Sequence, residues 1–187
     1  MDSVPRRSRE NGLSTPFSPS EEGGTSGSSP VVDSSSLTFF IKMSHNCKAL
    51  ILHCIDFHFG KAIKKYLEDN QLLGDCDIVS VAGATQNIAA PKSETDREFI
   101  LRQIDISKQL HNIGKIILMN HTDCGAYGGR KAFSSDEEEK RRHASDMKTA
   151  KKIILEKYPD LRVKIILTKI NDVHEITFEE IVDSRNK

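Results

Sequence analysis

Two short polar motifs, each placed directly after an apolar run, constrain this chain more than any other feature. Cys54-Ile-Asp-Phe-His58 follows the apolar residues 49–54, and His121-Thr-Asp-Cys124 follows residues 115–120. If the two runs are neighbouring parallel strands, their carboxyl ends lie side by side, where open α/β folds place their sites. We therefore expect Cys54, His121 and Cys124 to converge at one edge of a sheet.

The converging side chains predict a metal site. Two thiolates and one imidazole suit a tetrahedral zinc ion best, and three protein ligands leave the fourth position for water or a carboxylate. A single cysteine at the end of a strand is usually a core residue, so the pairing of the motifs carries the prediction. Asp56 could supply the carboxylate, because residues two apart in an extended chain point the same way. Alternatively, Asp56 caps the turn before Gly60.

Composition narrows the class of protein. The chain has 187 residues, with 27 Lys and Arg balanced by 27 Asp and Glu. One domain and no charge-driven binding of nucleic acid or of a membrane are expected. No apolar run approaches the ~20 residues that span a bilayer. Nothing marks secretion, so the cysteines are predicted to be reduced thiols or metal ligands in the cytoplasm. Cys47 and Cys76 are interpreted as structural, because neither follows a strand's carboxyl end.

Residues 1–42 differ from the rest of the chain. They contain 11 serines and 4 of the 6 prolines, with little apolar periodicity. Such a segment cannot bury enough surface to offset its ordering entropy, and we predict a disordered leader before a zinc-binding domain at 43–187. A targeting peptide is the alternative, since Arg6-Arg-Ser-Arg9 is basic, although the acidic residues of the segment argue against it.

The remaining sequence alternates strand and helix patterns. Strands are expected at 48–54, 77–82, 115–120 and 161–168, with a last short one at 175–179. This alternation predicts an α/β domain, a mostly parallel sheet of four to five strands with helices on both faces.

Helix signals lie between these strands. Gly74 is expected to stop the first helix, and Thr95-x-x-Glu98 and Ser135-x-x-Glu138 read as capping boxes that open two others. Three sets of apolar residues mark one side of each helix: Ile63, Tyr66 and Leu67; Phe99, Ile106 and Leu110; Met147, Ala150, Ile154 and Tyr158.

Cys-x-Asp, a strand ending in Ala-Gly, and His-x-x-Cys-Gly together resemble the β-class carbonic anhydrases, over about residues 48–129. The resemblance implies Cys54, His121 and Cys124 as zinc ligands and Asp56 as the catalytic aspartate. It also implies a homodimer or higher homo-oligomer that hydrates carbon dioxide reversibly to bicarbonate. Asp123, between two of the ligands, is expected to cap backbone rather than to react.

His58 stands where the family has an arginine that holds the aspartate away from zinc. Unlike arginine, histidine does not stay charged and offers no two-pronged grip on a carboxylate. We expect His58 to position Asp56 in place of the arginine. Two alternatives stay open: hydrolysis of carbonyl sulfide or carbon disulfide at the same site, and a non-catalytic zinc module that Asp56 closes as fourth ligand.

Overall fold

The computed structural model describes residues 45–171 and 175–182, so the predicted leader at 1–42 lies outside the described residues. One five-stranded sheet has the order β2-β1-β3-β4-β5. All neighbours are parallel except β5, which runs antiparallel to β4 at one edge. The strands are β1 (Ala49–His53), β2 (Cys76–Ser80), β3 (Lys115–His121), β4 (Arg162–Ile170) and β5 (Ile176–Glu180). The predicted α/β class and mostly parallel sheet are confirmed.

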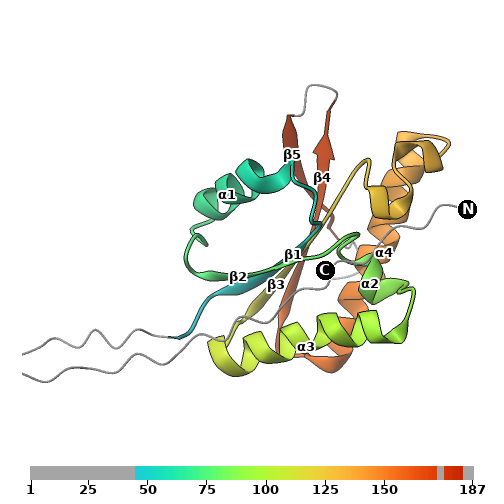
Figure 1. The fold of residues 1–187 in the computed structure, drawn as a ribbon. Helices are drawn as coiled ribbons and strands as arrows, with labels where there is room; N and C mark the ends of the chain where they lie inside the picture. Colours follow the sequence, from blue (N-terminus) through green and yellow to red (C-terminus); the bar gives the residue numbers. More distant parts are fainter. Residues whose placement is uncertain (1–44, 172–174, 183–187) are drawn as a thin grey trace, which may run out of the picture. The chain divides into compact units, whose positions relative to one another are not determined.

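Helices cover both faces of the sheet (Figure 1). α1 (Phe59–Asp69) packs on one face, where Phe59, Ile63 and Leu67 meet alternate residues of β1 and β3. The other face carries α2 (Gln86–Ala89), α3 (Glu94–His111) and α4 (Asp136–Lys157). Among the described residues, no helix combines the length and the apolar character that crossing a bilayer requires.

The central strands explain the position of the core. β1 and β3 are buried along almost their whole length, as continuous apolar runs covered on both faces should be. β1 has β2 on one side and β3 on the other, so the chain order reverses between β1 and β3. The carboxyl ends of these two strands therefore flank the crevice where ligands bind in such folds.

The helix starts differ in part from expectation. α3 begins after Ser93, whose hydroxyl accepts from Thr95 N–H while Asp96 reaches back to Ser93 N–H, so the expected box at Thr95 and Glu98 is wrong. The box fails there because Thr95 already lies inside the helix. α4 begins after Ser135, as predicted, and the hydroxyl of Ser135 accepts from the backbone N–H three residues on.

Two further expectations need correction, and one helix was not expected. α1 ends at Asp69, and Gly74 lies in the following turn with φ +76°. Cys76 opens β2, one residue before the predicted start of that strand. The short helix α2 was not predicted, because its four residues are too few for a periodic pattern.

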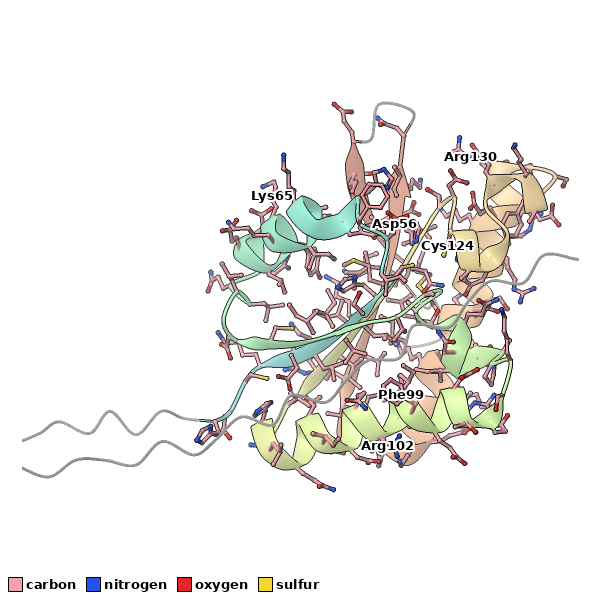
Figure 2. All side chains as sticks on the ribbon, viewed as in Figure 1. Asp56, Lys65, Phe99, Arg102, Cys124 and Arg130 are labelled. Atoms are coloured by element: carbon pink, nitrogen blue, oxygen red, sulfur yellow. The ribbon has the colours of Figure 1, made fainter. Side chains whose placement is uncertain are left out.

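The apolar side predicted for α3 faces solvent. Phe99, Ile106 and Leu110 are 45%, 42% and 62% exposed, whereas Ile100 and Ile104 of the same helix are buried against the sheet. Phe99 and Arg102, labelled on α3 in Figure 2, contact each other, with the Arg102 guanidinium 5.8 Å from the centre of the Phe99 ring. In contrast, the apolar sides predicted for α1 and α4 are buried.

Candidate metal centre

The two central strands deliver three potential ligands to one point. Cys54 directly follows β1, His121 ends β3, and Cys124 precedes the 3-10 helix η1 (Gly125–Tyr127). The two sulfur atoms are 3.9 Å apart, and the three donor atoms all lie within 4.8 Å of one another. All three side chains are buried. The structure thus brings together the three residues that the sequence singled out.

His121 presents an unsatisfied nitrogen to this cluster. Its Nδ1 lies 2.8 Å from the Thr122 carbonyl oxygen, which fixes the ring with Nδ1–H as the donor. The Phe59 ring packs edge-on against the imidazole, with ring centres 4.7 Å apart. Nε2 is buried and has no hydrogen-bond partner. A buried nitrogen without a partner is costly, and a metal ion between it and the two sulfurs would satisfy it.

The environment favours ionisation of one of the two thiols, that of Cys54. The hydrogen bond from the Cys124 thiol lowers the pKa of Cys54, and backbone N–H groups of Gly83 and Asp56 lower it further. That same shared hydrogen bond raises the pKa of Cys124, whose sulfur also accepts from backbone N–H groups of η1. One proton therefore remains between the two sulfurs until a cation displaces it. This donor set fits zinc.

Asp56 is held away from the three ligands by His58. Asp56 Oδ1 accepts from the His58 backbone N–H at 3.0 Å and from the His58 Nδ1–H at 2.7 Å. Burial alone would raise the pKa of Asp56, but the hydrogen bonds from His58 lower it, so the group is a carboxylate. Asp56 therefore caps a turn, one of the two expected roles, and does so through His58.

Asp123 supports the ligand loop through its backbone and side chain. It adopts φ +58°, its N–H donates to Glu139 Oε1 at 2.6 Å, and its Oδ1 accepts from the Arg130 N–H at 2.7 Å. A side chain at Gly129 would approach Asp123 Oδ1 to 3.2 Å. The close turn behind the ligands therefore requires glycine there, and Asp123 has the backbone-capping role predicted for it.

A cavity of about 500 Å³ opens beside the cluster. Asp56, His58, Asp123 and Arg130 are among the residues that line it. Figure 2 shows Asp56 and Cys124 at the same end of the sheet, with Arg130 on the segment that follows η1. The three potential ligands do not line this cavity themselves, whereas Asp56 and Asp123, which stand next to them in the sequence, do.

A buried polar network behind the ligands was not predicted from the sequence. Asn120 accepts from Thr85 Oγ1 at 2.7 Å, donates to the Tyr127 hydroxyl at 3.1 Å and lies 3.2 Å from His143 Nδ1. Glu139 is also buried, and its carboxylate lies 3.8 Å from His143 Nε2. The network joins residues of separate segments, Thr85 before α2, Asn120 in β3 and His143 in α4, and no local motif signals that these segments meet.

Two further histidines, His53 and His143, lie near the ligands, where a histidine could act as a proton shuttle or as a core residue. His143 is fully buried, and burial lowers its pKa to about 4. His53 is partly buried, its pKa is lowered by burial, and its Nδ1 lies 2.7 Å from the Cys54 carbonyl oxygen. Both therefore fit the core interpretation, because neither carries a proton readily at neutral pH.

Comparison with known proteins identifies the family to which this chain belongs. The family model described as "Putative carbonic anhydrase" matches residues 44–179. An uncharacterized protein of Rickettsia bellii (strain RML369-C) is 32% identical over 142 residues, which cover 74% of this chain and 87% of that protein. A second uncharacterized protein, from Rickettsia conorii (strain ATCC VR-613 / Malish 7), is 30% identical over 142 residues, covering 74% and 76%.

Solved structures give the fold. The β-carbonic anhydrase CafA of the fungal pathogen Aspergillus fumigatus matches with a TM-score of 0.50 over 75% of this chain and 78% of that one, at 14% identity. At this identity the likeness extends to the arrangement of helices and strands. It agrees with the mostly parallel sheet described above.

Proposed function

The chain belongs to the putative carbonic anhydrase family as a divergent member, and from this premise we propose that it is a zinc-dependent carbonic anhydrase, which hydrates carbon dioxide reversibly to bicarbonate. Cys54, His121 and Cys124 would hold the zinc ion. Asp56 would be the catalytic carboxylate and His58 the residue that positions it. All four cysteines are free thiols, which supports the expected cytoplasmic location.

One observation carries the choice of an enzyme over a closed zinc module. The potential metal cluster contains Cys54, His121 and Cys124 but not Asp56. His58 binds the Asp56 carboxylate instead, at 2.7 Å. A site closed by Asp56 would be structural, whereas three protein ligands leave the position that catalytic zinc sites keep open.

The proposed mechanism assigns a task to each side chain. Zinc held by Cys54, His121 and Cys124 would lower the pKa of a water molecule toward about 7 and would so supply a nucleophile at neutral pH. Asp56 accepts a hydrogen bond from the attacking water and orients it toward the carbon. His58 keeps that carboxylate in place, and Asp123 with Glu139 fixes the loop between two ligands. The lined cavity admits the substrate.

A homodimer or higher homo-oligomer is part of the proposal. The outer side of α3 exposes Phe99, Ile106 and Leu110. The neighbouring edge strand β2 exposes Ile78, at 54%. α3 and β2 are joined through a hydrogen bond from Ser107 to Asp77. An exposed apolar side of a helix and the free edge of a strand each commonly serve as interfaces between proteins.

The test compares three substrates at the same site. Zinc-loaded and metal-free protein would be assayed in parallel with carbon dioxide, carbonyl sulfide and carbon disulfide. The proposal expects zinc-dependent turnover with carbon dioxide as the best substrate. Zinc-dependent turnover of only the two sulfur compounds would replace the proposed substrate. If zinc is bound but none of the three compounds is turned over, the zinc site is structural rather than catalytic.

A further inference from the structure

A second cluster of metal-binding side chains lies at the opposite end of the sheet. Cys47 precedes β1, Asp77 is the second residue of β2, and His111 ends α3. Their ligand atoms all lie within 4.8 Å of one another. These positions are at the amino ends of the strands, whereas Cys54 and His121 lie at the carboxyl ends. The second cluster is therefore separated from the first by the length of β1.

Backbone hydrogen bonds hold the three donors together. The Cys47 N–H donates to the His111 carbonyl oxygen at 2.9 Å, which ties the entry to β1 to the end of α3. The Lys48 N–H donates to the Asp75 carbonyl oxygen at 3.0 Å, which ties it to β2. The donor positions are thus set by the fold, and a metal ion would not have to order them.

Asp77 is the centre of this cluster. His111 Nδ1 lies 2.9 and 2.8 Å from its two carboxylate oxygens, and the buried Ser107 hydroxyl donates to Oδ2 at 2.5 Å. Burial alone would raise the pKa of Asp77, but the bonds from Ser107 and His111 lower it. The hydrogen bond from Ser107 also orients the Asp77 carboxylate, as residues that surround metal ligands commonly do.

The thiol of Cys47 completes the donor set. Burial raises the pKa of Cys47, and the neighbouring Asp77 charge raises it further, so the group is protonated without a cation. A divalent ion would displace that proton and offset the charges of the thiolate and the carboxylate. Asp77 and His111 are 27% and 37% exposed, so an ion can enter from solvent.

We propose that Cys47, Asp77 and His111 bind a second zinc ion, with water in the fourth position. A mixed set of sulfur, oxygen and imidazole donors suits zinc, with bonds of about 2.0 to 2.3 Å. Tetrahedral geometry at such bond lengths separates ligand atoms by about 3.3 to 3.8 Å. The ligand atoms therefore need to shift only by about 1 Å. The metal ion would take the place of the proton that His111 Nδ1 shares with the Asp77 carboxylate.

The second zinc ion would have a structural role. It would join the start of β1, β2 and the end of α3 at the point where backbone hydrogen bonds of Cys47 and Lys48 and the Ser107 hydroxyl already bring them together. Binding to the folded chain alone stabilises it by mass action. This role is independent of the proposed hydration activity, because the ion lies away from the cavity beside Asp56.

The test measures zinc content and thiol protection in the full chain. After loading and removal of excess zinc, the unaltered protein should carry one more zinc ion per chain than Cys47→Ser or His111→Gln. Cys76→Ser is the matched control, since this neighbouring cysteine lies outside the cluster, and it should carry as much zinc as the unaltered protein.

Alkylation of the unaltered protein, mapped by mass spectrometry, avoids any effect of the substitutions on folding. Zinc should slow alkylation of Cys47 several-fold and leave that of Cys76 unchanged. Equal zinc content in the unaltered protein and both cluster variants would overturn the proposal. So would an alkylation rate of Cys47 that zinc does not change.

Discussion

The imidazole of His58 lies 2.7 Å from Oδ1 of Asp56, and this contact holds the carboxylate outside the cluster of potential zinc ligands. We propose that His58 positions the carboxylate, as an arginine does in the family that the sequence resembles. The His58 backbone N–H and Nδ1–H both donate to Asp56 Oδ1, in place of the two-pronged grip that a guanidinium offers.

The first prediction concerns this anchor. His58→Ala should lower kcat/KM about 10- to 100-fold, the usual cost of losing a residue that orients a metal-site group. His58→Arg should keep kcat/KM within a few-fold of the unaltered protein, because a guanidinium also donates to the Asp56 carboxylate. Stopped-flow assays of the zinc-loaded variants would measure both effects. An unchanged kcat/KM in His58→Ala, or an equal loss in both variants, would rule out a positioning role for His58.

The second prediction concerns Gly83, whose N–H donates to the Cys54 sulfur. It has φ +75°, and an added Cβ would lie 2.8 Å from Gln86 Oε1 and 2.9 Å from the Ala126 Cβ. Gly83→Ala should cost about 1–3 kcal/mol of stability and weaken zinc binding, measured by thermal unfolding and chelator competition. Gly114→Ala, with nothing within 4 Å, is the control. Equal zinc affinity in both variants would contradict this account.

The third prediction concerns self-association through α3. Sedimentation velocity should show a dimer or larger species, and Leu110→Lys should shift it toward the monomer, because a charge replaces an apolar side chain that is 62% exposed. Leu73→Lys, in the loop after α1, is the control for an added charge on a residue that is 54% exposed. A monomeric unaltered protein, or equal effects of both variants, would place no interface on α3.

The fourth prediction concerns stability in acid. Burial alone would raise the pKa of Asp105, but Lys157 Nζ and the Tyr158 hydroxyl, each 2.7 Å away, lower it below the ordinary 3.8. A carboxylate with a depressed pKa stabilises the fold above its unfolded pKa and loses that effect as pH falls through its folded pKa. Asp105→Asn should therefore cost about 0.5–1 kcal/mol near neutral pH.

Urea unfolding would check this prediction. The difference between Asp105→Asn and the unaltered protein should shrink as pH falls below 3.8. Asp69→Asn is the control, because Asp69 pairs with Lys65, which is labelled on α1 in Figure 2. Both side chains of this pair are exposed, and exposed pairs contribute little to stability. A difference that stays constant with pH would show that Asp105 acts through packing rather than charge.

The ligand residues could be predicted from the sequence because their positions follow from one rule. Residues that follow neighbouring parallel strands meet at one edge, and Cys54 and His121 each end an apolar run. The polar network behind them could not be predicted. Glu139 reaches the Asp123 N–H from a helix 16 residues away, and only the packing of α4 on the sheet creates that contact.

The buried side of α3 shows a different limit. Ile100 and Ile104 have helical spacing, and so do Phe99, Ile106 and Leu110, so periodicity alone offers two apolar sides. The structure buries the first set against the sheet and exposes the second. A helix at an interface needs one apolar side for the core and a second for the partner. The exposed side of Phe99, Ile106 and Leu110 therefore supports the proposed self-association.

The measurement that tests the central claim most directly is carbon dioxide hydration by stopped flow, with zinc-loaded protein from about pH 6.5 to about pH 9. Cys124→Ala, which removes one potential ligand, is the control. The account predicts activity that rises with pH, as ionisation of a zinc-activated water requires, and that vanishes in the control. Absence of activity at every pH, with zinc still held by Cys54, His121 and Cys124, would contradict it.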